Sequence, residues 1–242
     1  MRHREDRAPF GVLNRNMLAG ALLFVGGSLV TMAIPISEAL FPNYRVANNY
    51  ISDLGGPITL AEHPPGVVII HQPASIIFIL AVLLLGVSTL LSARTIGDQS
   101  SKWFRRFLYL YGIGALIVAA SYAPYYAYSN KLIPGPLTSV PIPIGVGAAA
   151  HGIGSLCVFL FGGLSAVTSF GMVKRPFSYF CLVAGVVAVL ALVFAELGIT
   201  IGLGIGGIER MSAYPTLAWT IAIGGYWMGM PEGRTKSTDE CS

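Results

Sequence analysis

The sequence predicts an all-α integral membrane protein, a bundle of six transmembrane helices with its N- and C-termini in the cytoplasm. Of the 242 residues, 54% are hydrophobic and only 11% are charged, against about 25% charged in an average soluble domain. Mean hydropathy is +0.69, and the chain contains six apolar runs near the roughly 20 residues that cross a bilayer. A transmembrane barrel is disfavoured because its strands are shorter and alternate in polarity.

The predicted spans form one membrane domain, residues 16–230, between a basic head at 1–15 and a polar tail at 231–242. The first apolar run has 20 residues, more than the roughly 7 to 15 of a secretory signal core, so we expect it to remain as a span. The last run begins at Tyr214-Pro215, where proline suits a first helical turn. The six spans cover about residues 17–36, 67–91, 107–126, 146–170, 177–203 and 214–230.

Lysine and arginine predict how the chain is oriented. With six spans and the N-terminus inside, the cytoplasmic segments hold twelve of these residues, and the outer loops hold three, Arg45, Lys131 and Arg210. Because cytoplasmic loops carry the excess of positive charge, we expect a multi-pass cell-membrane protein with its N-terminus inside. The net charge of +4 then reflects topology, and these scattered charges do not form a nucleic-acid-binding face. We expect membrane lipids as partners, a partner membrane subunit as an option, and no nucleic acid.

A polar segment at residues 48–56 (NNYISDLGG) separates the first two apolar runs. It places an acid, a hydroxyl and two amides in a chain that otherwise avoids charge, which predicts a site. Ser52 and Asp53 also suit the N-cap of a short helix, because both side chains accept backbone N–H groups. A direct role and a capping role are compatible at these two positions.

Apart from Tyr and Cys, three ionisable residues fall inside the predicted spans, each near an outer end. Helical rise places His71 about 6 Å deep, His151 about 7.5 Å and Glu196 about 10 Å. A charge within the bilayer costs roughly 2.5 to 3.5 kcal/mol, so such groups usually face a partner or water. Glu196 has the strongest functional expectation, since a buried carboxylate needs a partner or a proton. For His151 a hydrogen-bonded core role and a functional role are both open. For His71 we expect a structural role.

These positions together predict an outward-facing polar pocket. Glu196 and His151 would form its floor, His71 its wall, and the 48–55 segment its roof. The predicted pocket residues are Asn49, Ser52, Asp53, His71, His151, Glu196, Glu209 and Arg210.

Arg210 is the expected counter-ion of this pocket, paired with either Asp53 or Glu196. Glu209 and Arg210 are neighbours in sequence and would not face each other on a helix, so we expect each to pair elsewhere. Gly198, Gly202 and Gly206 recur every four residues, which predicts close helix packing along the fifth span and its end.

Several ordered motifs are similar to those of a known family. They are residues 49–55 (NYISDLG) after the first run, His151-Gly152 in the fourth, and residues 206–210 (GGIER) with Tyr214-Pro215, Trp219 and Gly225. In these the chain resembles the membrane family catalogued as domain of unknown function 998, over roughly residues 17–230. The resemblance implies a six-span prokaryotic membrane protein and places Asp53, His151, Glu209 and Arg210 in the family pattern. It brings no established catalytic residues.

Two classes of function compete at this stage. The first is a binding or structural membrane protein whose pocket holds a lipid head group, a small polar ligand or a partner subunit. The second is a membrane-embedded hydrolase acting on a lipid or lipid-linked substrate. In the hydrolase, Ser52 or a metal-bound water would be the nucleophile and His151 the general base, oriented by Asp53 or Glu196. The chain has no G-x-S-x-G or H-E-x-x-H motif to support it.

A third hypothesis uses the similar depths of His71 and His151. Two histidines on different spans could ligate haem or, with a carboxylate, zinc, as in an accessory subunit of a larger membrane complex. No cofactor or metal is assigned from the sequence. A transporter is a variant of the binding hypothesis, but the inner halves of the spans show no polar pathway.

Overall fold

The computed structural model describes residues 15–56, 71–96, 100–128 and 142–230. The predicted polar tail, the predicted head apart from its last residue, and the first four residues of the predicted second span lie outside the described residues. Within the described ranges all regular structure is helical, which confirms the predicted fold class.

Six long helices make up the bundle, and short helical segments connect some of them. The long helices are α1 (Arg15–Leu40), α2 (Ala74–Thr95), α3 (Lys102–Ser121), α5 (Ile142–Thr168), α6 (Phe177–Glu196) and α7 (Gly204–Met228). The short segments are η1 (Ile51–Leu54), α4 (Ala123–Tyr128) and η2 (Ser169–Met172).

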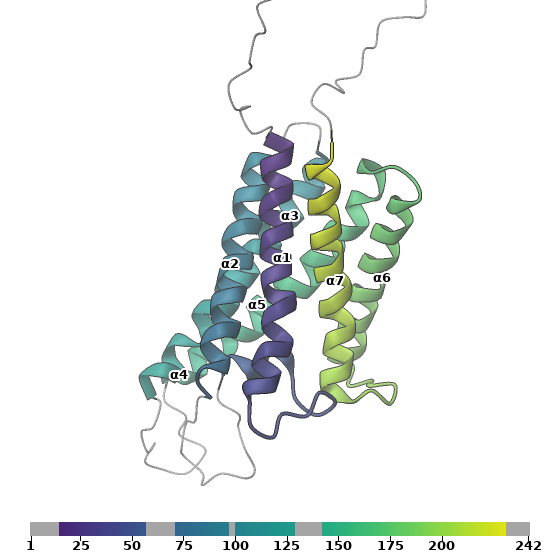
Figure 1. Ribbon diagram of the computed structural model, residues 1–242. Helices are drawn as coiled ribbons and strands as arrows, with labels where there is room; N and C mark the ends of the chain where they lie inside the picture. The colour runs from purple at the N-terminus through teal and green to yellow at the C-terminus, as the bar shows by residue number, and fades with distance from the viewer. Residues whose placement is uncertain (1–14, 57–70, 97–99, 129–141, 231–242) are drawn as a thin grey trace, which may run out of the picture.

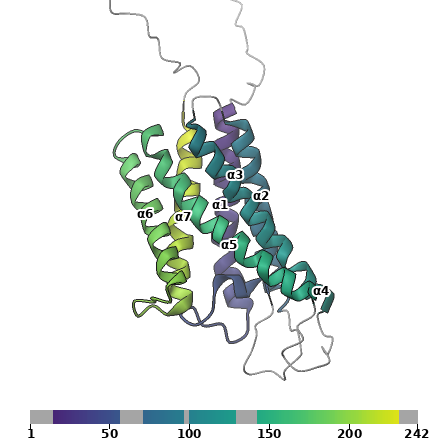
Figure 2. The ribbon, with the colours of Figure 1, turned by 180° about the vertical axis from the view of Figure 1, so that it is seen from behind.

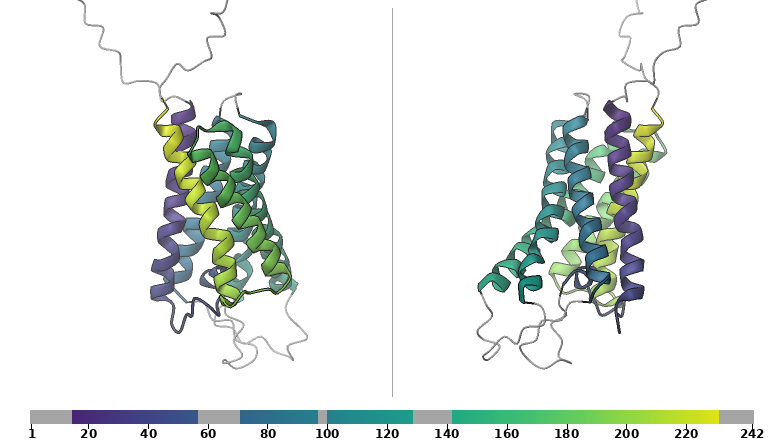
Figure 3. Two further views of the ribbon diagram at one scale, coloured as in Figure 1. Left: turned by 90° about the vertical axis from the view of Figure 1, so that its right-hand side faces the viewer. Right: turned by 60° about the vertical axis from the view of Figure 1, so that its left-hand side comes forward.

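The long helices run alternately up and down and form a ring (Figures 1 and 2). Each packs against the next along the chain, and α7 returns to pack against α1, while α5 also reaches α7 across the ring. The start of α1 and the end of α7 lie at the same end of the bundle (Figure 3). We call the opposite end, where α1, α3 and α6 finish, the loop end.

Glycine pairs bring neighbouring helices into close contact. A Cβ built on Gly20 of α1 would lie 2.6 Å from the carbonyl oxygen of Gly224 on α7. Glycines face each other in the same way across three further interfaces, Gly86 with Gly112, Gly114 with Gly154, and Gly163 with Gly185. Association of helices within lipid depends on such close backbone approach, because apolar side chains gain little by leaving lipid tails.

Within the described part of the chain, five of the six long helices, all but α7, have the length and composition of membrane spans. Among the described residues, α1, α2, α3, α5 with η2, and α6 are each long and apolar enough to cross a bilayer. Large apolar side chains point outward along them, such as Met32 at 62% exposure and Val183 at 59%. Helices satisfy their own backbone hydrogen bonds, so a ring with this apolar surface suits lipid. The protein is therefore a multi-pass membrane protein, and its orientation stays a prediction.

The last two spans differ from their predicted limits. The fifth span was expected to reach residue 203, but α6 ends at Glu196. The sixth was expected to begin at Tyr214, but α7 begins ten residues earlier, at Gly204, so that Pro215 lies inside the helix. The predicted limits were wrong for two reasons. The fifth apolar run continues through the turn that follows α6, and Glu209 and Arg210, which interrupt the apolar pattern, are part of a helix.

The glycine series at 198, 202 and 206 does not form a helix face. Gly198 and Gly202 have φ values of +71° and +81° and lie in the turn between α6 and α7. Positive φ is accessible to glycine at little cost and ends a right-handed helix. Gly206 lies on α7 and packs against the loop that follows α1 rather than against another helix.

Candidate functional site

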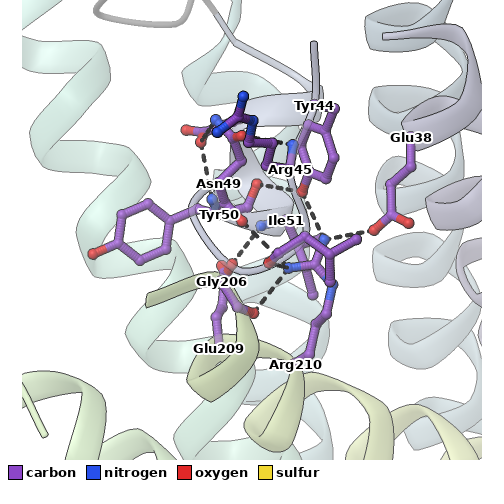
Figure 4. Close-up of polar contacts among 11 residues, drawn as sticks. Glu38, Tyr44, Arg45, Asn49, Tyr50, Ile51, Gly206, Glu209 and Arg210 are labelled. Carbon is purple, nitrogen blue, oxygen red and sulfur yellow. Dashed lines mark hydrogen bonds and ion pairs between the residues drawn. The ribbon is translucent and has the colours of Figure 1, made fainter. Parts of the chain in front are cut away.

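The segment 41–56, which includes η1, folds over the loop end and rests on the first turns of α7 (Figure 4). The Gly206 N–H donates to the carbonyl oxygen of Ala47 at 3.1 Å. A Cβ on Gly206 would lie 2.1 Å from the carbonyl oxygen of Asn49 and 2.2 Å from that of Val46. Only glycine allows the segment to approach α7 this closely.

Arg210 binds the backbone of this segment. Its Nη1 donates to the carbonyl oxygens of Val46 at 3.0 Å and Asn49 at 3.3 Å, and to that of Gly206 one helical turn earlier at 2.8 Å. The side chain is buried. The planar guanidinium offers several donors in a fixed geometry, so one side chain holds three carbonyl groups in place.

The other terminal nitrogen of Arg210 binds side chains. Nη2 lies 2.5 Å from Glu38 Oε1, near the end of α1, and donates to the Tyr44 hydroxyl at 2.7 Å. Tyr44 in turn donates to the carbonyl oxygen of Tyr50 at 2.8 Å. Burial raises the pKa of Tyr44, so this phenol keeps its proton and can donate while it accepts. Figure 4 shows both partners converging on the guanidinium.

The predicted partner of Arg210 was therefore wrong. Asp53 or Glu196 was expected to pair with it, and Glu38 does so instead. The expectation that Glu209 and Arg210 pair separately is confirmed, because the Glu209 carboxylate accepts the backbone N–H of Ile51. Glu209 is 8% exposed and, within the described ranges, forms no ion pair.

Asp53 and Asn49 stabilise the fold of the segment itself. The Asp53 carboxylate accepts the backbone N–H of Tyr50 at 2.9 Å and the Asn49 side-chain amide at 3.4 Å. Asn49 Oδ1 accepts the backbone N–H of Arg45 at 2.9 Å. Asp53 thus caps η1 from its third position. Burial raises the pKa of this carboxyl above its ordinary value, against the opposing effect of its hydrogen bonds.

Tyr122, at the end of α3, holds η1 from its other side. Its hydroxyl donates to the carbonyl oxygen of Ser52 at 2.8 Å. A Cβ on Gly55 would lie 2.6 Å from the ring of Tyr122, so the chain passes directly against it. Ser52 is itself among the residues that line a cavity inside the bundle.

His151 lies near the loop end of α5 and belongs to a second polar cluster. Its Nδ1 is 3.2 Å from Ser121 Oγ on α3, and its Nε2 is 3.2 Å from Ser155 Oγ one turn along α5. Its ring packs against that of Tyr122, with centroids 5.2 Å apart. The Tyr122 side chain therefore links the two clusters, because it contacts the His151 ring and bonds Ser52 of η1.

The hydroxyl protons in this cluster determine the tautomer of His151. Ser121 Oγ donates to the carbonyl oxygen of Val118 at 2.6 Å, and a hydroxyl carries only one proton. Ser121 must therefore accept from Nδ1–H. In the neutral ring Nε2 is then an acceptor, and the Ser155 hydroxyl donates to it.

The two other predicted pocket residues lie apart from these clusters. His71 packs on Phe41, with ring centroids 4.3 Å apart, at the start of the segment. Glu196 is the last residue of α6 and is exposed. The expected position of Glu196, about 10 Å deep at the floor of a pocket, depended on a fifth span that continued to residue 203. That position is wrong.

A cavity of about 70 Å³ lies inside the ring beneath η1. Helices α1, α2, α3, α5 and α7 all contribute to its lining, which is mainly aliphatic and aromatic. Ser52, Tyr111, Ser155, Glu209 and Thr216 are the polar residues among its lining, but the surface exposed to the cavity is almost entirely apolar. Glu209, in the first turns of α7, is the one carboxylate residue among the described lining residues, and its carboxylate accepts the Ile51 N–H.

Within the described part of the chain, no three His, Cys, Asp or Glu side chains gather closely enough to hold a metal ion. His71 and His151 contact different partners, Phe41 in one case and two serines in the other. The sequence interpretation missed the residues that serve these clusters, among them Glu38, Tyr44, Gly206, Ser121, Tyr122 and Ser155. Glu38 was detectable as a charge at the end of the first span, whereas the hydroxyl residues resemble ordinary span residues.

Comparison with known proteins found no match among curated proteins or solved structures. A family model described as "Protein of unknown function (DUF998)" matches residues 17–226, nearly the whole membrane domain. The matched range contains both polar clusters and the cavity between them. The chain belongs to this DUF998 family of membrane proteins.

Proposed function

We propose that this protein binds a small amphipathic molecule inside the membrane, in the cavity beneath η1. The apolar part of the ligand would lie among the helices, and an amine or hydroxyl end would donate to Glu209. The observation that carries the proposal is the cavity itself, whose lining includes the buried residue Glu209, which has no ion-pair partner among the described residues. An ionisable residue kept at such a position is costly unless it serves a partner.

The geometry supports a small ligand or a lipid end group over the other options. A water molecule needs about 10 to 15 Å³ of such space, so the cavity of about 70 Å³ accepts a group of several heavy atoms. A partner subunit would need an exposed surface, and most of the cavity lining is buried. Ser155, Val158 and Phe159 are only half-buried, which favours entry along α5.

Filling the cavity tests this proposal. Ala115 of α3 is fully buried and lines the cavity, so Ala115→Leu should occupy the space of the ligand. Ala120→Leu is the matched control, because Ala120 is an exposed residue of the same helix. Native mass spectrometry of the protein released from membranes should show a bound small molecule in wild type and in the control, and none in Ala115→Leu. Equal occupancy in all three proteins would place the ligand elsewhere.

Glu209→Gln tests the polar end of the site. The amide oxygen can still accept the Ile51 N–H, so the segment stays docked while the negative charge is lost. We expect ligands with an amine end to be lost and neutral lipids to be unaffected. Retention of the same amine ligand by this variant would rule out the carboxylate as its partner.

A second function, acyl hydrolysis, is favoured by the contact between Ser155 and His151. The sequence suggested Ser52 as nucleophile, but the serine that bonds His151 Nε2 and lines the cavity is Ser155. Ser121 orients the ring through Nδ1. The order of nucleophile, base and orienting group is that of serine hydrolases.

In this reaction Ser155 Oγ would attack the carbonyl carbon of an ester while its proton passes to His151 Nε2. The protonated ring would then give that proton to the departing alkoxide, leaving an acyl group on Ser155. Water would attack the acyl carbon, losing a proton to His151, and the ring would return the proton to Ser155 as the acid leaves.

A fluorophosphonate probe distinguishes this function from binding alone. We expect it to label wild type and Ser52→Ala but not Ser155→Ala or His151→Gln. Ser165→Ala is a further control, because Ser165 lies on the same helix and bonds only its own backbone. Absence of labelling in wild type would leave binding as the function of the cavity.

A further inference from the structure

A basic hollow lies at the end of the bundle opposite the loop end, separate from the cavity. Its volume is about 450 Å³, and the residues that line it belong to the first turns of α3, except for Ser100, which lies two positions before the helix. They are Ser100, Lys102, Arg105, Arg106 and Tyr109. Among these described lining residues three carry positive charge and two carry hydroxyl groups.

This set of side chains matches the chemistry of a phosphate group. Phosphate oxygens accept hydrogen bonds and carry negative charge, and guanidinium and ammonium groups are their usual partners. Arg105 Nη2 donates to Ser100 Oγ at 3.2 Å, which fixes that guanidinium against the side of the hollow. Ser100 is buried, whereas Lys102 and Arg106 are exposed and can close on a ligand.

The surroundings place the hollow at the surface of the membrane. Trp103, in the first turn of α3, is 59% exposed, and the Arg106 guanidinium lies 5.1 Å above its ring. Exposed tryptophan beside basic residues is typical of the head-group level of a bilayer. Tyr109 is seven residues beyond Lys102, about 10 Å along the helix, so the hollow extends from the head-group level towards the acyl chains.

We propose that this hollow binds the phosphate of an anionic membrane lipid, with the exposed Lys102 and Arg106 as its cationic partners. Under the predicted orientation this end faces the cytoplasm, where anionic lipids attract basic residues near the membrane. The site is independent of the cavity beneath η1 and of its ligand.

The test compares lipid binding to wild type and to two charge-matched double variants. Lys102→Gln with Arg106→Gln removes two cations from the hollow. Lys174→Gln with Arg175→Gln removes two exposed cations between η2 and α6, at the same end of the bundle. Affinity for phosphatidylglycerol and for phosphatidylcholine would be measured by native mass spectrometry of the detergent-purified protein.

We expect wild type to prefer phosphatidylglycerol, and the variant of the hollow to lose roughly 30-fold in affinity for it, from about one kcal/mol per cation. The control variant should lose much less. Equal losses in both variants, or equal binding of the two lipids by wild type, would overturn the proposal. Inorganic phosphate is added in a further arm, and displacement of the lipid at matched concentration would assign the hollow to free phosphate instead.

Discussion

Arg210 and Glu38, 172 residues apart in the chain, form an ion pair of 2.5 Å that joins the start of α7 to the end of α1. The same guanidinium holds the segment between them through the carbonyl groups of Val46 and Asn49. A single side chain therefore joins α1 to α7 at the loop end and positions η1 above the cavity. Loss of this ion pair should loosen the end of α1, the start of α7 and the segment 41–56 together.

Glu38→Gln should lower the free energy of unfolding by roughly 1.5 to 3 kcal/mol, the usual contribution of a hydrogen bond to a charged group. Arg210→Lys should cost at least as much, because an ammonium cannot reach the carbonyl oxygens and the carboxylate at once. Arg175→Lys, at an exposed position, should stay within about 0.5 kcal/mol of wild type. Unfolding by sodium dodecyl sulfate in mixed micelles measures all three, and equal stabilities would contradict a role for the pair.

Gly206→Ala should disrupt the docking of the segment on α7. The added methyl group would lie 2.1 Å from one carbonyl oxygen and 2.2 Å from another, so the segment must move. We expect a loss of about 1 to 3 kcal/mol, as for other overpacked positions, together with faster proteolysis within residues 41–56. Gly152→Ala is the control, because a Cβ there meets nothing within 4 Å, and alanine should favour α5 slightly. If both variants behaved alike, close approach at Gly206 would not be the cause.

Much of this fold follows from hydropathy, but the start of α7 does not. Glu209 and Arg210 lower the apolar signal at the point where the helix begins, and the groups that satisfy them come from residues 38–51, far away in the chain. Conversely, residues 197–203 have the apolar composition of a span but are not helical. Gly198 and Gly202 have positive φ there, and α6 ends before them. Hydropathy reports only how apolar a segment is. The wrong start of α7 and the wrong end of α6 both arise where tertiary contacts or backbone conformation override that signal.

The site was partly predictable for the same reason. The segment 48–56 is conspicuous because polar residues are rare here, and Asp53 suits a cap by its chemistry. Its docking partners are glycine, tyrosine and serine, which are common in membrane helices and carry no distinctive pattern. The pairing of Arg210 with Glu38 rather than Asp53 depends on how far α1 extends past the apolar run, and composition does not determine that length.

Asp53 should make the stability of the protein depend on pH. Because burial raises the pKa of its carboxyl above the ordinary 3.8, the folded state holds the proton more tightly than the unfolded state. This contribution is fully present below the ordinary pKa and is lost as pH rises through the folded-state value. Asp53→Asn should therefore match wild type in acid and become the more stable protein towards neutral pH. Thermal unfolding of both proteins across that range measures the difference, and a difference that is constant with pH would show that Asp53 does not titrate this way.

His151 should be held in one tautomer by its two serines. The Ser121 hydroxyl donates its hydrogen bond to the Val118 carbonyl oxygen, so it must accept from Nδ1–H. Nε2 is then left to accept from the Ser155 hydroxyl. Nitrogen-15 spectra of histidine-labelled protein should show the Nδ1–H form in wild type at a pH where the ring is neutral. Ser121→Ala removes the acceptor and should let the Nε2–H form appear, whereas Ser165→Ala, about four turns beyond His151 on α5, should leave the spectrum unchanged. A wild-type ring already in the Nε2–H form would mean that Ser155 accepts rather than donates, and Ser155 would then lack the base that hydrolysis requires.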